Sequence, residues 1–147
     1  MATEMKVQLR QTSATTSEAT MGPHRVLVDR PIDKNGTDLG PMGGQLFLAS
    51  VGGCFMSNLL AAIRARESRI SGVRTEIVAT VTDSPARFAA IELRICADGP
   101  DGDLLPHLVE IADRACIMMN TLRGKLDVTL KIDEPDHAVT SAGAEIS

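Results

Sequence analysis

The chain has 147 residues and a net charge of −4, and it carries no run of Lys or Arg. This acidic balance argues against a protein that binds nucleic acid or a membrane surface through a basic patch. Aromatic residues are limited to three Phe, with no Trp or Tyr, so stacking platforms for bases are missing as well. A chain of this length fits one domain, residues 1–147, and is long enough to bury a core without disulfide or metal staples.

The three cysteines, Cys54, Cys96 and Cys116, form no CxxC pair, and no Cys/His group has the spacing of a zinc site. We therefore expect neither a metal nor another cofactor. Residues 1–20 are polar and lack the apolar segment of a signal peptide, so we expect a cytoplasmic protein. In that reducing compartment, cysteine pairs are more often catalytic or metal-binding than structural.

The first elements along the chain are predicted to be two strands and a loop. Residues 5–10 alternate between apolar and polar side chains, as a half-buried strand does, and residues 24–29 also fit a strand. Residues 30–44 are rich in Pro, Gly, Asn and Asp, which predicts a loop.

Nearly every residue from Leu46 to Ile63 is apolar or small, and a run of this length raises the question of a membrane-spanning helix. Polar residues and glycines interrupt the run, and the sequence offers no second candidate, so we interpret residues 45–66 as a buried helix. A helix that is apolar on all sides is expected to be buried on all sides. One subunit has too few other elements to cover such a helix, which predicts a homodimer.

The following segments predict a hairpin and a second helical region. Residues 73–81 and 91–97 alternate and are separated by turn residues, which is typical of a β-hairpin. A helical region is expected from about Asp103 to Gly124, with Pro106 tolerated in its first turn. Its apolar stripe consists of Leu104, Leu108, Ile111, Ala115 and Met119.

The C-terminal part is predicted to hold one more strand, over residues 126–132, and a loose polar tail over residues 133–147. The core would then span about residues 5–132. The order of strands, helix, strands, helix and strand indicates an α+β protein with helices against antiparallel sheet.

Cys54 and Cys116 are the residues most suited to chemistry, although an isolated apolar cysteine is more often a core thiol. Cys54 follows Gly52 and Gly53, which cost a helix roughly 1–2 kcal/mol relative to alanines. The glycines leave room for a substrate or another backbone to approach the thiol. Cys116 lies in the second helical region, whereas Cys96 lies on the polar face of its strand and is interpreted as incidental.

Two segments resemble the OsmC/Ohr family of thiol-dependent peroxidases. They read HRVLVDRP…NGTDLGPMGGQLFLASVGGCFMSNLLAAI around Cys54 and EIADRACIMMNTLRGKLDVTLKI around Cys116. The resemblance implies an intertwined homodimer with antiparallel sheets wrapped around central helices. It also implies reduction of organic hydroperoxides, with Cys54 as the peroxidatic and Cys116 as the resolving cysteine. A thiol reductant such as a dihydrolipoyl group would reopen their disulfide, and Arg25 is the candidate cation that activates Cys54.

The chain departs from the family's pattern at two positions. Gly44 stands where the family has a glutamate that orients the arginine, and Ile117 stands where the family has a proline after the second cysteine. These departures are typical of a divergent branch of the family. They leave open an alternative function, a small-molecule binding protein of OsmC fold that has lost efficient peroxidase activity.

Overall fold

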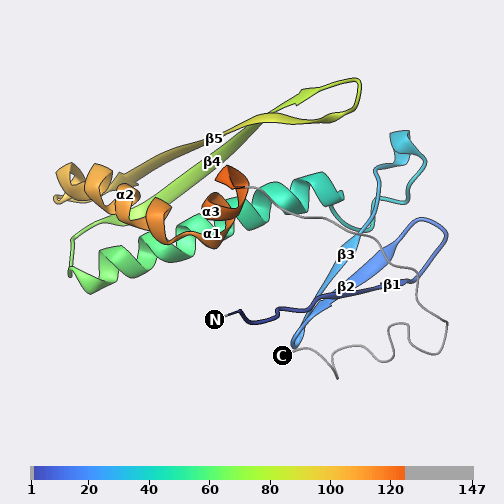
Figure 1. Cartoon of the computed structure of the whole chain (residues 1–147), viewed down its shortest axis with the longest axis horizontal. Helices are drawn as coiled ribbons and strands as arrows, with labels where there is room; N and C mark the ends of the chain where they lie inside the picture. Colours follow the sequence, from blue (N-terminus) through green and yellow to red (C-terminus); the bar gives the residue numbers. More distant parts are fainter. Residues whose placement is uncertain (1, 125–147) are drawn as a thin grey trace. The chain divides into compact units, whose positions relative to one another are not determined.

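The computed structural model describes residues 2–124, which form two compact units, residues 2–46 and residues 47–124 (Figure 1). The predicted strand over residues 126–132 and the predicted tail over residues 133–147 lie outside the described residues. The assignment of the whole chain to one domain stays a prediction.

The first unit is a three-stranded antiparallel sheet in the order β1–β2–β3, with strands Gln8–Gln11, Ser17–Met21 and His24–Val28. The strand predicted over residues 24–29 is confirmed over His24–Val28. The strand predicted over residues 5–10 begins only at Gln8, and the expected half-burial is not found, because Val7 is 50% and Leu9 is 53% exposed. The central strand β2 was not predicted, because its small and polar residues have little intrinsic preference for a strand. Ala19 becomes buried between Leu9 and Val26, so pairing on both sides creates this strand.

A buried carboxylate organises the loop that follows β3. Asp29 accepts hydrogen bonds from the Thr16 hydroxyl at 3.0 Å, the Thr37 hydroxyl at 2.5 Å and the Leu39 N–H at 3.2 Å. These donors hold the pKa of Asp29 far below its usual range. The Thr37 hydroxyl is the largest cause, and the N–H of Arg30 contributes as well. The carboxylate therefore stays ionised and ties residues 30–39 to the end of β2.

We predict that Asp29→Asn lowers the thermal midpoint at neutral pH, because an amide cannot accept from all four donors. The folded-state pKa of Asp29 is lowered, so its stabilising effect is present above the ordinary carboxyl pKa of about 3.9 and is lost as the pH falls through the folded value. The difference in midpoint between the variant and the original chain should therefore shrink below about pH 4. A difference that is constant from pH 7 to pH 3, followed by circular dichroism, would contradict this role.

The second unit combines a hairpin with three helices. Its elements are α1 (Gly43–Ala65, which begins in the first unit), β4 (Ser71–Thr82), β5 (Arg87–Asp98), α2 (Leu105–Ala115) and α3 (Ile117–Arg123). The strands of the hairpin pair Thr75 with Ile95 and Ile77 with Leu93, which confirms the predicted apolar face. Antiparallel sheets together with helices confirm the α+β class.

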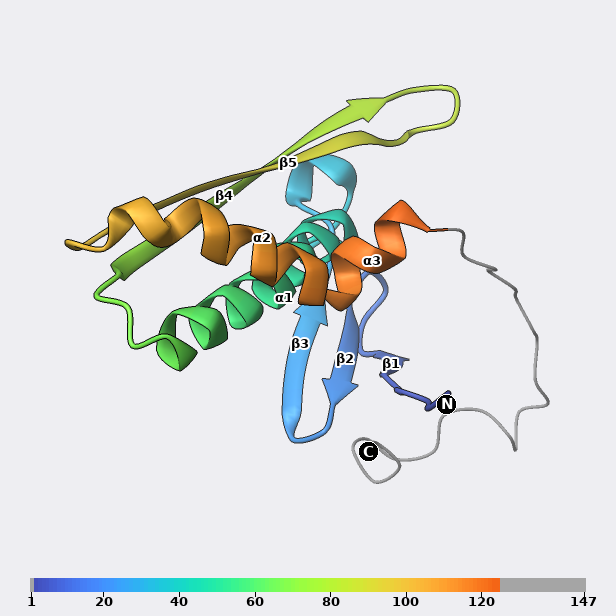
Figure 2. The ribbon, with the colours of Figure 1, turned by 60° about the vertical axis from the view of Figure 1, so that its left-hand side comes forward.

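The core of this unit lies between α1, α2 and the hairpin (Figure 2). Helix α1 contributes Phe55, Leu59, Ala62 and Ile63, and α2 contributes Leu108 and Ala112. Val73, Leu93 and Ile95 of the hairpin pack against this cluster.

Residues 2–124 of a single chain leave part of α1 exposed, so its predicted burial on all sides, which requires a partner subunit, stays a prediction. Only 33% of its most apolar 18-residue window is buried, and Leu60 is 48% exposed. The helix is long and apolar enough to cross a membrane by length and composition, with a mean hydropathy of 1.9 over that window. A single helix of this kind is weak evidence for a membrane span, because core helices share this composition, and one face of α1 does form the core.

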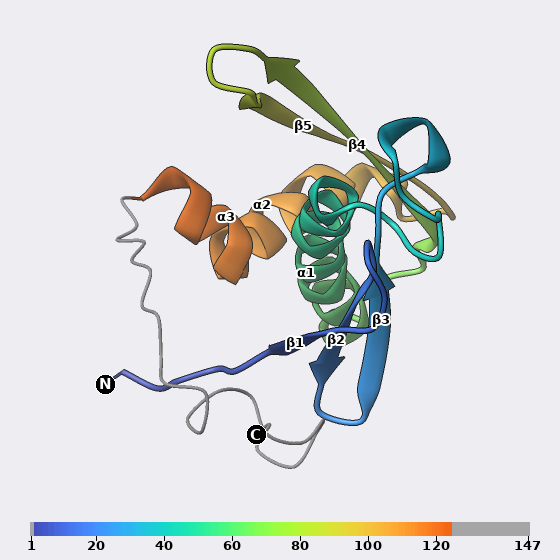
Figure 3. The same ribbon diagram turned by 90° about the vertical axis from the view of Figure 1, so that its right-hand side faces the viewer.

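The second helical region was predicted without an interruption, but it consists of three consecutive pieces. It begins with a 3₁₀ turn, Gly102–Leu104, and Pro106 lies in the first turn of α2 as expected. Leu108 of the predicted stripe is fully buried, whereas Leu104 is 43% exposed. The region is then broken at Cys116 into α2 and α3, which point in different directions (Figure 3), and it ends at Gly124 as predicted.

Candidate functional site: a pair of thiols at a helix break

Cys54 lies in the middle of α1 and is half-buried. Its helix neighbours Val51 and Phe55 are buried, so the turn that carries the thiol is anchored in the core. Packing explains why position 52 is a glycine, because a Cβ atom there would collide with Cδ1 of Ile77 on β4. The space beside Gly52 is therefore filled by a side chain of the same unit, whereas a Cβ at Gly53 would meet nothing within 4 Å. The predicted approach of a substrate or another backbone to the thiol stays a prediction.

Cys116 lies at the break between α2 and α3 and is fully buried. Its backbone is extended, with φ −79° and ψ 116°, which turns the chain out of the helical path for one residue. The Cys116 thiol donates to the Cys54 sulfur over 3.3 Å, across a separation of 62 residues in the sequence. The structure thus brings together the two cysteines that the sequence singled out, and both are free thiols.

The break redistributes the backbone hydrogen bonds around Cys116. In a continuous helix the N–H of Met118 would donate to the carbonyl of Arg114, four residues earlier. Here the side-chain amide of Asn120 donates to that carbonyl over 3.1 Å.

The two thiols consequently have opposite acidities. The N–H of Met118 is the largest cause that lowers the pKa of Cys54, and the Cys116 thiol and the N–H of Ile117 act in the same direction against partial burial. Burial is the largest cause that raises the pKa of Cys116, and hydrogen bonding to Cys54 raises it further. The arrangement therefore favours a Cys54 thiolate beside a protonated Cys116.

Asn58 is a neighbour of the thiols that sequence reasoning missed. Its side-chain amide donates to the Cys54 carbonyl at 2.9 Å and lies 3.9 Å from the Cys54 sulfur. The sequence signal that could have pointed to Asn58 is an asparagine four residues after a cysteine in an otherwise apolar helix. Asn120 was also missed, because only the break at Cys116 gives its amide a carbonyl to bind.

Arg25 lies on β3 of the first unit, whereas both cysteines belong to the second. Its guanidinium lies 3.6 Å from the Glu18 carboxylate, which also faces Arg10 at 3.6 Å. A role of Arg25 in activating Cys54 stays a prediction. Gly44 has no side chain to hold an arginine, and Glu18 is the acid paired with Arg25 among the described residues.

The remaining sequence candidates lie apart from the thiol pair. Cys96 is exposed on the outer face of β5, opposite Arg74, as the alternation predicted. Residues 2–124 contain no cluster of three or more His, Cys, Asp or Glu side chains that could hold a metal ion.

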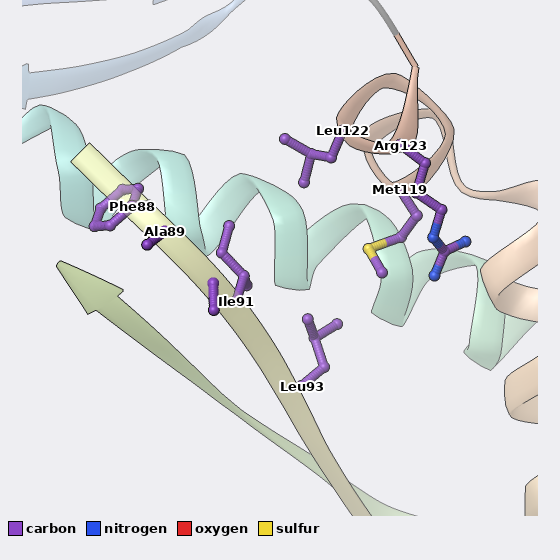
Figure 4. A pocket seen from close by; sticks show the side chains of 8 residues that line it. Phe88, Ala89, Ile91, Leu93, Met119, Leu122 and Arg123 are labelled. Atoms are coloured by element: carbon purple, nitrogen blue, oxygen red, sulfur yellow. The ribbon is translucent and has the colours of Figure 1, made fainter. Parts of the chain in front are cut away.

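A hollow of about 330 Å³ lies between β5 and α3 (Figure 4). Met119 and Leu122 of α3 lie on one side of it, and Ile91 and Leu93 of β5 lie on the other. Met119 and Leu93 also pack against the core cluster that contains Cys116. The hollow is lined by apolar side chains and by Arg123, so it offers both apolar contact and a positive charge to a small molecule.

We predict that Gly52→Ala destabilises the chain, because overpacking costs about 1–3 kcal/mol and the gain in helix propensity is only about 1 kcal/mol. Ile77→Val removes the Cδ1 atom that the new methyl group would meet. The double variant should therefore unfold at higher denaturant concentration than the sum of the two single effects predicts. Strict additivity in urea unfolding would mean that this contact does not limit position 52.

Taken together, the fold and the site define an α+β protein in which the thiols of Cys54 and Cys116 face each other. Residues 36–131 match the protein family described as OsmC-like protein. The chain belongs to this family.

Curated relatives and solved structures agree with that assignment. The chain is 32% identical over 103 residues to an organic hydroperoxide resistance protein of Xanthomonas axonopodis pv. citri (strain 306), covering 65% of this chain and 72% of that protein. An OsmC-like protein of Mycoplasma pneumoniae has a similar fold, with a TM-score of 0.73, 15% identity and coverage of 84% and 90% of the two chains. An organic hydroperoxide resistance protein of Elizabethkingia anophelis matches with a TM-score of 0.64, 18% identity and coverage of 84% and 91%. At these identities the solved structures support the fold.

Proposed function

We propose that the protein reduces organic hydroperoxides with Cys54 as the peroxidatic and Cys116 as the resolving cysteine. The observation that carries the proposal is the 3.3 Å contact between the two sulfur atoms, with the pKa of Cys54 lowered and that of Cys116 raised. The relative from Xanthomonas, which is named for organic hydroperoxide resistance, supports this substrate class.

The proposed reduction cycle requires only the thiols of Cys54 and Cys116 and an external dithiol as the reductant. The Cys54 thiolate attacks the outer oxygen of ROOH, the O–O bond breaks, and the alkoxide takes up a proton to leave as ROH. Cys54 is then a sulfenic acid, and the Cys116 sulfur displaces its hydroxyl as water to form a disulfide. A dihydrolipoyl group or a similar dithiol reduces that disulfide and is itself oxidised to a disulfide.

The geometry suits the second step in particular. Sulfur atoms in a disulfide are about 2.05 Å apart, so the pair needs only a small approach from its present separation. The hollow beside Leu93 and Met119 would receive the alkyl group of the hydroperoxide. A cytoplasmic location, where a dithiol reductant is maintained, belongs to the same proposal.

Arg25 is proposed to assist Cys54 as a cation held in place by Glu18. Freezing an arginine side chain costs up to about 2 kcal/mol, and a carboxylate partner offsets that cost. Glu18 is 19% exposed, so it offers Arg25 a partly desolvated partner where Gly44 offers none.

The functional unit is proposed to be an intertwined homodimer. The face of α1 that residues 2–124 leave exposed carries small residues and one leucine, namely Ala49, Ser50, Gly53, Ser57, Leu60 and Ala61. Small side chains allow two helices to approach closely, and an exposed apolar face gains free energy by being covered. A second copy of the same helix fits this face by symmetry.

We expect Cys54→Ser to abolish consumption of an organic hydroperoxide in the presence of dihydrolipoamide. Cys116→Ser should complete one turnover and stop at the sulfenic acid, because no thiol remains to resolve it. Cys96→Ser is the matched control, since Cys96 is exposed and lies apart from the pair. Equal activity of Cys54→Ser and the unsubstituted chain would overturn the proposal.

Titration of free thiols separates the peroxidase from the alternative binding protein. One equivalent of cumene hydroperoxide should remove two of the three thiols of each chain, and mass spectrometry should place the new disulfide between Cys54 and Cys116. Three intact thiols after this treatment would favour a small-molecule binding protein.

We predict a mass of twice 15.6 kDa in solution by light scattering at micromolar concentration. Ser57→Glu places a charge on the exposed face of α1 and should shift the mass toward the monomer, because an unpaired charge is costly to bury. Lys34→Glu, a change of charge in the 3₁₀ turn Ile32–Lys34, is the control. A monomeric mass of the unsubstituted chain at these concentrations would contradict the dimer.

A further inference from the structure

We propose that the thiols of Cys54 and Cys116 form a chelating site for monosubstituted trivalent arsenicals, compounds in which arsenic carries one carbon substituent and two exchangeable oxygens. The proposal requires that both cysteines are free thiols, as they are in this structure. It requires no reaction with a peroxide, so it is tested separately from the proposed function.

The distance between the two sulfur atoms is the observation that carries the proposal. The Cys116 sulfur lies 3.3 Å from the Cys54 sulfur. Trivalent arsenic holds its three ligands in a pyramid with angles close to a right angle, because a lone pair occupies the fourth position. An As–S bond is similar in length to a Zn–S bond, roughly 2.3 Å, so a right angle at arsenic places two sulfur atoms about 3.3 Å apart. One arsenic atom therefore fits the pair without a change in the sulfur separation.

The number of donors selects the kind of ligand. Residues 2–124 contain no group of three or more His, Cys, Asp or Glu side chains that could hold a metal ion, whereas a structural zinc site uses four protein ligands. Inorganic arsenite has three hydroxyls and is bound most tightly by three thiols. A monosubstituted arsenical already has one bond from arsenic to carbon, so two sulfur atoms complete its coordination.

Burial of the site favours a ligand that forms a neutral product. Cys116 is fully buried and Cys54 is half-buried. An arsenic atom with one carbon and two thiolate sulfurs has no net charge, so its formation leaves no unpaired charge in the core. Cys54 is the accessible sulfur and forms the first bond, and Cys116 closes the chelate.

Both cysteines are held in place by contacts that do not involve their thiols. Val51, in the turn of α1 before Cys54, is fully buried. The N–H of Cys116 donates to the Asp113 carbonyl at 3.3 Å. The guanidinium of Arg123 on α3 lies 2.9 Å from the Asp113 carboxylate on α2, which links the two helices that meet at Cys116. Donors that are already in place lose little freedom when a ligand binds.

The exchange of ligands on arsenic involves no oxidation or reduction. Phenylarsine oxide is hydrated in water and then carries two hydroxyls. The Cys54 sulfur replaces one hydroxyl and the Cys116 sulfur replaces the other, and each hydroxyl leaves with a thiol proton as water. Arsenic stays trivalent throughout. The second As–S bond forms within one molecule, so it benefits from a high effective concentration of the second thiol.

The experiment adds one equivalent of phenylarsine oxide to the reduced full chain and counts the thiols that still react with a maleimide. We expect one of the three thiols to remain reactive, one phenylarsenic group per chain by mass spectrometry, and recovery of all three thiols with excess dimercaprol. Cys54→Ser and Cys116→Ala should each weaken binding about 100-fold or more, because each removes the chelate. Cys96→Ser should bind as tightly as the unsubstituted chain.

A variant with the same number of thiols tests the geometry of the pair. Cys116→Ala combined with Ala115→Cys moves one thiol to an exposed position at the end of α2. This chain should bind phenylarsine oxide as weakly as Cys54→Ser does. The unsubstituted chain should bind sodium arsenite more weakly than phenylarsine oxide. Circular dichroism checks the fold of each variant, and Cys54→Ser keeps the test decisive if loss of the buried Cys116 thiol destabilises the chain.

Three reactive thiols after the addition of phenylarsine oxide would overturn the proposal. Tight binding that persists in Cys54→Ser, or in the chain with the moved thiol, would overturn the assignment of the site to this pair. Equal or tighter binding of arsenite would overturn the two-sulfur geometry. Tight binding by a chain that leaves hydroperoxides intact would support the arsenical site and reject the proposed function.

Discussion

One residue of extended backbone, at Cys116, is the constraint on which the thiol site depends. A straight helix from Leu105 to Arg123 would pair each N–H with a carbonyl four residues earlier and would leave no donor for a sulfur atom. The turn out of the helical path places the Cys116 thiol 3.3 Å from the Cys54 sulfur. Hydrogen bonding from the N–H of Met118, the Cys116 thiol and the N–H of Ile117 lowers the pKa of Cys54. Proximity and acidity thus have a common structural origin.

The two cysteines differ because their surroundings differ. Cys116 is fully buried, and burial disfavours its charged form. Cys54 is only half-buried and receives several donors, so its thiolate is the form that the site stabilises. In the proposed reaction, Cys54 attacks the peroxide and Cys116 stays protonated until a sulfenic acid has formed beside it.

Ile117 deserves comparison with the proline that the family's pattern has after the second cysteine. A proline at this position has no N–H and cannot donate to Cys54. The isoleucine of this chain supplies that donor.

The two faces of helix α1 have different roles: one packs in the core and orients Cys54, and the other is exposed. Its buried face, with Val51, Phe55 and Leu59, fixes the rotation of the helix in the second unit and therefore the direction of Cys54. Gly52 lets Ile77 of β4 come close enough to complete this packing. The opposite face, with Gly53 and Ser57, is left to solvent or to a second subunit.

The sequence by itself determined the elements whose patterns are local. Alternation along residues 73–81 and 91–97 was enough to predict the hairpin, because a strand places successive side chains on opposite faces. The apolar run around Cys54 predicted α1, and the two family-like segments identified the cysteine pair. The order of these predicted elements along the chain also predicted the α+β class.

Only the tertiary structure decided the features that depend on residues far apart in the chain. Strand β2 has no strong strand signal and exists because it pairs on both edges. The break at Cys116 has neither glycine nor proline as a sequence signal, and it lets the Asn120 amide donate to the Arg114 carbonyl. The acidity of Cys54 follows from that break, since hydrogen bonds to a sulfur atom are set by three-dimensional contacts and leave no periodic trace in the sequence.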